Sequence, residues 1–344
     1  MFIALLTFYF LFFALIGDYV IFLPKFFSNY FTPAQIGIIF AMMPIARFLT
    51  PFIFLKKPLT KRDYILSIFI AFLSSFLILT KNFYLILIAF FLIGASFAVL
   101  FPYIEAIAIE RLKTKYGKAR VMGSIGFMLY GILFSYIKIN HLISFIVLMS
   151  LTALSAFSFK EDKTIKKSSS AKINFFKDYK FWLGLILLQI SFGGFYNFFT
   201  IYLINHGVDK KYIGWLWGIG VIAEIIIFLI GHKFLHKLPP IKWIKISIFL
   251  TSIRWAMLYL FANSIFLIAL SQLIHAFSFA IFHTSALLYI SKKYENKTLA
   301  QQFYAGIGYG LAAFLGSIIS GFLYGNKLFL YESLIALIGF LVML

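Results

Sequence analysis

The sequence of 344 residues contains no cysteine and only 11 acidic residues. Without cysteine the chain forms neither a disulfide framework nor a thiolate metal site. Charged residues make up 12% of the sequence and hydrophobic residues 62%, whereas a soluble domain has roughly 45–50% apolar residues. A chain with so little charge and so much apolar surface requires lipid around it and not water.

The sequence also lacks the short motifs of ATP-driven pumps and of common hydrolases. It has no P-loop, no His-Glu-x-x-His helix and no Gly-x-Ser-x-Gly turn. Gly218-x-Gly220-x-x-Ala223 has the form of a dinucleotide fingerprint, but it lies in an apolar run with no preceding strand, which favours close helix packing. We therefore expect no enzyme, no cofactor and no metal site.

Long apolar runs dominate the remainder of the sequence. A helix needs roughly 20 apolar residues to cross a hydrocarbon core. Runs of about this length or longer predict an all-α membrane protein of twelve transmembrane helices, near residues 2–25, 33–55, 63–80, 82–110, 117–137, 139–158, 181–205, 211–235, 241–261, 264–291, 298–325 and 327–344. The first run begins at Met1 with no basic segment before it, which is typical of a retained helix and not of a signal peptide.

The connections between these runs alternate in charge. One set carries 23 Lys and Arg and the other set only 6, so the positive-inside rule places the basic set and both chain termini in the cytoplasm. The formal charge of +20 is thus divided into short loop patches, and nucleic acid is not expected as a partner. The excess of Lys over Arg is typical of an AT-rich bacterial genome, so we expect the inner membrane of a bacterium.

An internal repeat relates the two halves of the chain. Gly17-x-Tyr19, Ile36-Gly37 and Ile45-Ala46-Arg47 recur as Gly194-x-Tyr196, Ile213-Gly214 and Ile222-Ala223-Glu224, at one shared offset of 177 residues. The repeat predicts two pseudo-symmetric six-helix bundles, residues 1–158 and 181–344, joined by a lysine- and serine-rich cytoplasmic linker, residues 159–180. A substrate site is expected where such halves meet near the middle of the membrane.

Several ionisable residues lie inside the predicted spans. A charge at the centre of a span costs about 2.5–3.5 kcal/mol on insertion scales, so such groups face a cavity or a partner. The candidates are Asp18, Arg47, Glu105, Arg120, Glu224, Arg254, His275 and His283. Ion pairs that only hold helices together are the structural alternative for each of them.

Depth along the spans sorts these residues into groups. At about 1.5 Å per residue, Glu224, Arg254 and His275 reach a similar level near the midplane, which predicts one cluster with His283 two turns below His275. Glu105 and Arg120 approach a common level across one short loop. Asp18 and Arg47 differ by roughly 12 Å in depth, so their pairing stays open. Glu332 begins the last span and is expected only at the membrane interface.

Several segments together resemble permeases of the major facilitator superfamily, in particular the 3-phenylpropionate transporter family and, more distantly, lactose permease. The resemblance covers nearly all of the chain, and it rests on Ala46-Arg47-Phe48, Tyr116-Gly117-Lys118-Ala119-Arg120, Ile222-Ala223-Glu224, Ile253-Arg254-Trp255 and Gln272-Leu273-Ile274-His275. It implies that Glu105 and Arg120 are similar to a substrate-binding pair, and that Glu224, Arg254 and His275 are similar to a coupling cluster. Asn197 also matches the seventh helix of lactose permease.

The sequence departs from lactose permease at Ser278, where that permease has its main proton-carrying glutamate, at Phe192, which replaces a carboxylate, and at the added acid Asp18. The loop Lys56 to Arg62 lacks the Gly and Asp of the usual superfamily loop. Galactoside transport by the same coupling route is therefore not the expected function.

We predict a secondary transporter that imports a small organic solute, preferably an organic acid, together with protons by alternating access. Asp18, Arg47, Glu105, Arg120 and Asn197 are the candidate substrate-binding residues, and Glu224, Arg254, His275 and His283 the candidates for proton coupling. The expected partners are the substrate, protons and membrane lipid, and the expected state is a monomer. A sugar or nucleoside symporter, an exporter, or a membrane sensor without transport are the alternatives.

Overall fold

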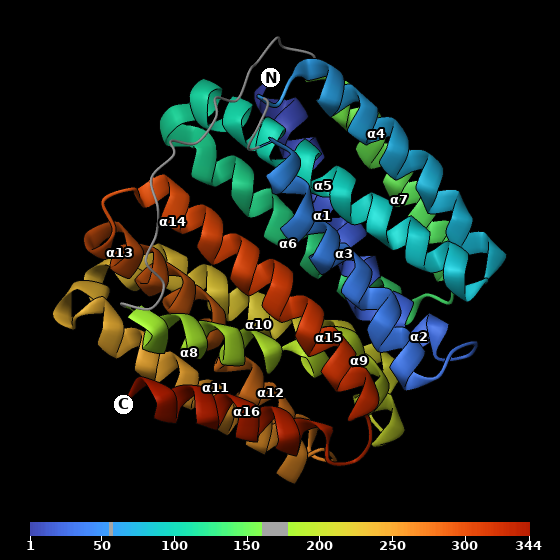
Figure 1. Ribbon diagram of the computed structural model, residues 1–344. Coiled ribbons are helices and arrows are strands. Elements are labelled where there is room, and N and C mark those ends of the chain that lie inside the picture. The colour runs from blue at the N-terminus through green and yellow to red at the C-terminus, as the bar shows by residue number, and fades with distance from the viewer. Residues whose placement is uncertain (55–57, 160–177) are drawn as a thin grey trace.

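The structure is a computed structural model that describes residues 1–54, 58–159 and 178–344. These residues form helices joined by short turns, and no strand occurs among them. In Figure 1 the N-terminal half, coloured blue to green, lies on one side of the molecule and the C-terminal half, coloured yellow-green to red, on the other. The predicted linker falls almost entirely in residues 160–177, outside the described residues.

The N-terminal half contains six spans, several of them built from more than one helical segment. Its helices are α1 (Phe2–Gly17), η1 (Asp18–Phe22), α2 (Leu23–Phe27), α3 (Pro33–Phe54), α4 (Lys61–Ser75), η2 (Phe76–Thr80), α5 (Phe83–Leu112), η3 (Lys113–Lys115), α6 (Tyr116–Tyr136) and α7 (His141–Ala156).

The C-terminal half repeats this arrangement of six spans. Its helices are α8 (Tyr179–Ile190), α9 (Gly193–Asn205), α10 (Lys210–Ile230), η5 (Gly231–Lys233), η6 (Leu235–Lys237), α11 (Pro240–Leu260), α12 (Ile265–Leu273), η7 (Ala276–Ile281), α13 (Phe282–Lys293), α14 (Lys297–Tyr304), η8 (Ala305–Ala312), α15 (Ala313–Phe322) and α16 (Leu328–Met343).

The predicted number of spans agrees with these helices. Nine helices among the described residues are long and apolar enough to cross a membrane, and one of them, Phe83–Tyr136, is a 54-residue run that contains both α5 and α6. Two shorter apolar helices, His141–Ala156 and Leu328–Met343, complete the set of twelve. The prediction of a twelve-helix all-α membrane protein is therefore confirmed.

Local capping explains where several spans begin. Asn82 and Asn140 each accept two backbone N–H groups through the side-chain oxygen at the start of α5 and α7. Thr60 and Asp63 form a reciprocal capping box at the start of α4. These side chains satisfy N–H groups that have no partner within the first helical turn. Each span thus begins close to the residue that its sequence predicts.

Three spans contain a π-helical segment with a wider turn. These segments are η1, η7 and η8, and they begin at Asp18, directly after His275 and at Ala305. π-Segments inside α-helices are rare and often mark functional sites, because the wider turn redirects side chains. Two of the three segments lie at a residue that the sequence analysis selected for its charge.

The two halves contact each other through small residues near one end of the spans. In α3, a Cβ at Gly37 would collide with the carbonyl oxygen of Ser317 and with Gly321 of α15. In α10, a Cβ at Gly214 would collide with the backbone of Gly131 in α6. Small residues let helix backbones approach this closely. Gly37 and Gly214 are repeat partners at the offset of 177 residues, so the same position brings each half against the other.

Polar contacts reinforce this end, which carries the 6 basic residues of the lysine-poor loops. The N–H of Gly214 donates to the Ser135 hydroxyl at 2.8 Å, and the Trp215 indole donates to the Tyr136 hydroxyl at 2.9 Å. In Figure 1 the same end brings α2 and α3 beside α9 and α15. We call it the lysine-poor end, and in this structure it is the closed end of the molecule.

Glu332 corrects one sequence-based expectation. It does not lie at the membrane interface, because only 3% of its surface is exposed. Its carboxylate accepts the backbone N–H groups of Gly194 and Phe195, at the start of α9. The span α8–α9 is interrupted there, and an interrupted helix leaves N–H groups that need an acceptor. Glu332 on α16 supplies this acceptor from another helix.

We expect Gly214→Val to open the lysine-poor end, because its side chain would collide with the backbone of Gly131. The cysteine of a Ser317→Cys variant reports access to this end, because Ser317 is buried there and the chain has no other thiol. Alkylation of this cysteine by a maleimide should become several-fold faster in the Gly214→Val variant. Gly117→Val is the control, because an added Cβ there meets no atom within 4 Å. Equal rates in the two variants would contradict the close helix contact.

We expect Glu332→Ala to destabilise the C-terminal half, because it leaves the N–H groups at the start of α9 without an acceptor in a buried position. The loss of one such acceptor typically costs about 1–3 kcal/mol. Thermal unfolding of the purified protein in detergent should therefore occur at a lower temperature in Glu332→Ala than in Glu332→Gln, which keeps an acceptor oxygen. Equal unfolding temperatures would show that the carboxylate does not cap α9.

Candidate functional site

Glu105 and Arg120 form one of the two predicted charge clusters. The Nε atom of Arg120 in α6 lies 3.5 Å from Oε1 of Glu105 in α5. The Tyr9 hydroxyl of α1 donates to the same carboxylate at 2.7 Å, and the Tyr116 hydroxyl donates to its other oxygen. The carboxylate therefore has partners on both oxygens, which indicates that Glu105 positions Arg120.

Aromatic rings surround the guanidinium group of Arg120. Its Cζ atom lies 4.5 Å from the ring centre of Phe13, 5.3 Å from that of Phe101 and 5.5 Å from that of Tyr9. A cation over aromatic faces is stabilised without being neutralised. The side chain of Arg120 still exposes 35% of its surface, so this positive charge is accessible to a ligand.

A second cluster lies in the C-terminal half and contains Glu224, His275 and Arg254. Oε2 of Glu224 in α10 lies 3.7 Å from Nε2 of His275. Nδ1 of the same imidazole lies 2.9 Å from NH1 of Arg254 in α11, and NH2 of Arg254 donates to Gln272 at 2.7 Å. The three residues that depth alone placed at one level are therefore consecutive members of a single chain of contacts.

The contact with Arg254 fixes the protonation form of His275. Arginine carries only donors, so Nδ1 of His275 must accept. The imidazole is therefore neutral, with its proton on Nε2, the ring nitrogen that lies nearer to Glu224. Both ring nitrogens are then occupied, so His275 connects Arg254 to the Glu224 carboxylate.

Arg254 is fully buried beside two aromatic rings. Its guanidinium lies 4.3 Å from the ring centre of Phe195 and 4.5 Å from that of Trp255. Within the predicted cluster, His275 stands between Glu224 and Arg254.

His283 follows His275 on the same helix face. Its ring stacks on Phe279 at 5.9 Å, and Phe279 stacks on His275 at 5.8 Å, so three parallel rings descend one helix face. The Nδ1 atom of His283 lies 3.0 Å from the hydroxyls of both Tyr304 and Tyr309. The His283 imidazole thus has hydrogen-bond partners of its own and is not in contact with Arg254.

Arg47 and Asn197 lie on opposite halves. Arg47 in α3 is exposed although it lies in the middle of a span, and it acts electrostatically on Tyr19 of η1. Asn197 in α9 is 5% exposed, and its amide nitrogen has no hydrogen-bond partner among the described residues. An unpaired buried donor is costly unless a water or a ligand accepts its hydrogen bond.

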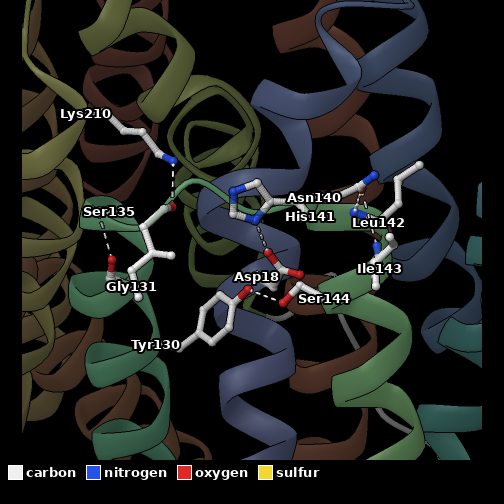
Figure 2. Close-up of polar contacts among 11 residues, drawn as sticks. Asp18, Tyr130, Gly131, Ser135, Asn140, His141, Leu142, Ile143, Ser144 and Lys210 are labelled. Carbon is white, nitrogen blue, oxygen red and sulfur yellow. Dashed lines mark hydrogen bonds and ion pairs between the residues drawn. The ribbon is translucent and has the colours of Figure 1, made fainter.

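Asp18 does not pair with Arg47. It is completely buried, and its Oδ1 atom lies 2.8 Å from Nδ1 of His141 at the first turn of α7. Figure 2 shows the two side chains facing each other, with Tyr130 of α6 alongside. In this structure the pair has no exposed carboxylate surface, so Asp18 is not accessible to a substrate in this conformation.

Sequence reasoning missed four polar residues of these clusters, namely Tyr9, Tyr116, His141 and Gln272. Their signal was weak because a tyrosine or a histidine near the end of an apolar run is also common at a membrane interface. Only contacts between helices identify them as partners. No group of three or more His, Asp or Glu side chains that would suit a metal ion occurs within residues 1–54, 58–159 and 178–344.

Comparison with known proteins places these clusters in a transporter fold. The sequence profile of the MFS_1 like family matches residues 2–332. The chain is 26% identical over 263 residues to a probable 3-phenylpropionic acid transporter of Escherichia coli (strain K12), which covers 70% of this chain and 69% of that protein.

Solved structures of transporters superpose on nearly the entire chain. The nucleoside transporter NupG superposes with a TM-score of 0.82 at 18% identity, covering 99% of this chain and 98% of that one. The human organic anion transporter MFSD10 (TETRAN) superposes with a TM-score of 0.68 at 13% identity, covering 100% and 98%. These structures share the fold, and the match of the family profile over 2–332 shows that the chain belongs to the MFS_1 like family, transporters of the major facilitator superfamily.

Proposed function

We propose that this transporter imports a small organic anion together with a proton, with Glu224 as the proton carrier. The observation that carries the proposal is the contact chain Glu224–His275–Arg254 in the middle of the C-terminal half. A carboxylate that is 17% exposed among apolar spans is accessible to a proton yet poorly hydrated. The neutral His275 beside it connects this carboxylate to the buried Arg254.

Charge balance within the spans supports an anionic substrate. By formal charge, Arg47, Arg120 and Arg254 stand against Glu105, Glu224 and Glu332, while Asp18 pairs with His141. Once Glu224 takes up a proton, one positive charge is in excess. A monoanion would neutralise this charge, and the exposed Arg120 offers it paired N–H donors.

The names of two similar proteins point to the same substrate class. The Escherichia coli relative is named for 3-phenylpropionic acid, and the human protein MFSD10 is named an organic anion transporter. The rings of Phe13 and Phe101 beside Arg120 would provide apolar contact for an aromatic acid, while the guanidinium would bind its carboxylate. Substrate and proton would then lie on facing halves.

A neutral nucleoside is the second candidate. NupG is named a nucleoside transporter and shares the fold over nearly the entire chain. The unpaired amide of Asn197 suits hydrogen bonding to an uncharged polar ligand, and its burial suits a compact one. This candidate depends on hydrogen bonds and does not require a net positive site.

Loop charge supports an orientation in which the lysine-poor end faces the periplasm of a bacterial cell and both termini face the cytoplasm. In this orientation the contacts at Gly37 and Gly214 close the outer side, which corresponds to an inward-facing state of the alternating-access cycle. We propose that a monomer performs this cycle, because each half supplies one of the two charge clusters.

We expect Glu224→Gln to abolish uphill accumulation of substrate while exchange across the membrane continues. The amide resembles a permanently protonated carboxylate, so substrate can cross without a net proton. The measurement is uptake of labelled 3-phenylpropionate into proteoliposomes, with and without a pH gradient, alongside counterflow. Asp209→Asn, in a surface loop, is the matched control. Accumulation at the parent rate in Glu224→Gln would remove Glu224 from the coupling mechanism.

We expect Arg120→Lys to weaken binding of 3-phenylpropionate about tenfold or more, since lysine offers a point charge where arginine offers two parallel hydrogen bonds, and one hydrogen bond to a charged group contributes about 1.5–3 kcal/mol. Glu105→Gln should affect this acid less. Binding is measured in detergent, with thermal unfolding as the check on folding and Lys118→Arg, an exposed neighbour, as the control.

The same variants distinguish the two substrate classes. If uridine binds to the parent protein, and Arg120→Lys binds it normally while Glu105→Gln does not, the transporter recognises a neutral solute. That pattern would require the organic-anion proposal to be abandoned. A parent protein that binds neither 3-phenylpropionate nor uridine would exclude both probes as substrates.

A further inference from the structure

Asp18 and His141 form a buried ionisable pair that the coupling cluster does not include. Asp18 is 0% exposed and His141 7%, and the atoms Oδ1 and Nδ1 lie 2.8 Å apart. The pair joins η1 to α7 within the N-terminal half, as Figure 2 shows. The second oxygen of Asp18 has no hydrogen-bond partner among the described residues.

The C-terminal half covers this pair at the lysine-poor end. Both α9 and α10 pack against η1. The ring of His141 stacks on Phe22 at 4.5 Å, and the ammonium group of Lys210 in α10 lies 5.7 Å from the centre of the same Phe22 ring. Lys210 also donates to the carbonyl of Ile137, four residues before His141, at 3.4 Å. Separation of the halves at this end would therefore expose the pair to water.

The neighbouring titratable groups are few. His141 and Tyr130 act on the Asp18 carboxyl, and the Tyr130 hydroxyl hydrogen-bonds with Ser144 at 2.7 Å. Lys210 is the cation that the C-terminal half brings to this region, with Lys138 near it in the loop before α7. The number of protons that the pair binds therefore depends chiefly on Asp18 and His141, because few other charged groups lie near them.

We propose that Asp18 and His141 form a proton-binding site that couples closure of the lysine-poor end to uptake of one proton. With one shared proton the pair carries no net charge, whether it exists as aspartate with imidazolium or as carboxylic acid with imidazole. Without that proton it carries one negative charge, and with two protons one positive charge. Burial of an uncompensated charge is costly, so the closed end accepts the pair with one proton.

The direction of the pH effect follows from the open form. When water reaches the pair, an ordinary imidazole has a pKa of about 6.5 and an ordinary aspartate a pKa of about 3.9. Above pH ~6.5 the open pair has lost its proton, so closure must take one up, and a lower pH favours closure. The ratio of closed to open molecules should then rise about tenfold per unit decrease in pH above this point, and level off below it.

This inference rests on the proposed function only in assuming that the two halves alternate, and it does not require Glu224 to carry the transported proton. It assigns Asp18, which the sequence suggested for substrate, to the control of access at one end of the molecule. The site would take up a proton from the side on which the lysine-poor end opens. In the orientation that loop charge supports, that side is the exterior.

The absence of cysteine makes a direct distance measurement simple. Tyr84→Cys in α5 and Asn263→Cys before α12 introduce exposed spin-label sites, one in each half at the lysine-poor end. Double electron–electron resonance in detergent micelles, between pH ~5.5 and ~8.5, reports the closed and open distances without any substrate. We expect the short distance to gain population as the pH falls from ~8.5 toward about 6.5, and to change little below that pH.

Two variants should change the pH response of the label distance in different ways. A purely structural pair would give no pH response for these variants to change. In Asp18→Asn the pair is neutral without a proton, so the closed form should persist at pH ~8.5, and a lower pH should no longer favour closure. In His141→Gln the lone carboxylate must still be neutralised, so a lower pH should favour closure down toward pH ~4. The double variant should show no response to pH.

Glu224→Gln separates this site from the coupling cluster. If the inference is correct, this variant keeps the parent pH response of the label distance, even where accumulation of substrate is lost. An unchanged pH response in both Asp18→Asn and His141→Gln would overturn the inference, and so would a parent protein whose distances do not depend on pH. If Asp18→Asn fails to fold, His141→Gln alone tests the inference. Closure of His141→Gln still requires a neutral carboxyl group at Asp18, so loss of the pH response in this variant would also overturn the inference.

Discussion

The need to neutralise charge inside an apolar bundle governs the arrangement of this transporter. Four acidic side chains within the spans, Asp18, Glu105, Glu224 and Glu332, each meet a basic or hydrogen-bonding partner on another helix. Glu105 meets Arg120 and two tyrosines, and Glu332 meets the start of α9. Because each partnership connects different helices, the same contacts that neutralise charge also determine which helices are adjacent. Movement of the helices must therefore change how the charges are paired.

Interrupted helices allow these partnerships to exist. The break between α8 and α9 releases N–H groups that hold Glu332, and the π-segments η1 and η7 begin at Asp18 and directly after His275. A continuous α-helix would satisfy its own backbone and present its side chains at fixed angles. Each irregular segment therefore lacks some regular α-helical hydrogen bonds, and it positions one ionisable group. Two of these irregularities lie at repeat partners, since Gly17 directly precedes η1 and Gly194 lies at the start of α9.

Much of this architecture can be read from the sequence, and the reasons are physical. The length of an apolar run predicts a span, and distance from the start of the run gives depth, so the shared level of Glu224, Arg254 and His275 was visible without a structure. Depth does not tell which way a side chain points. The sequence therefore could not place His275 between Glu224 and Arg254, nor exclude Arg47 as the partner of Asp18.

Residues close to span ends were the hardest to interpret. His141 begins a span and Glu332 lies one turn inside another, so both resemble ordinary interfacial residues when only their position along the chain is known. Their role depends on a neighbour from a distant segment, at a separation of 123 residues for Asp18 and 138 residues for Gly194. Such partners follow from the packing of helices and not from the local sequence.

The stacked rings of His275, Phe279 and His283 separate two groups of polar side chains in the C-terminal half. A phenyl ring has no exchangeable hydrogen, so Phe279 interrupts any side-chain hydrogen-bond chain between the two imidazoles that it separates. Of these two imidazoles, Glu224 and Arg254 contact only that of His275, whereas Tyr304 and Tyr309 contact only that of His283. A change of charge at Glu224 therefore has no direct hydrogen-bonded path along this helix face to the two tyrosines.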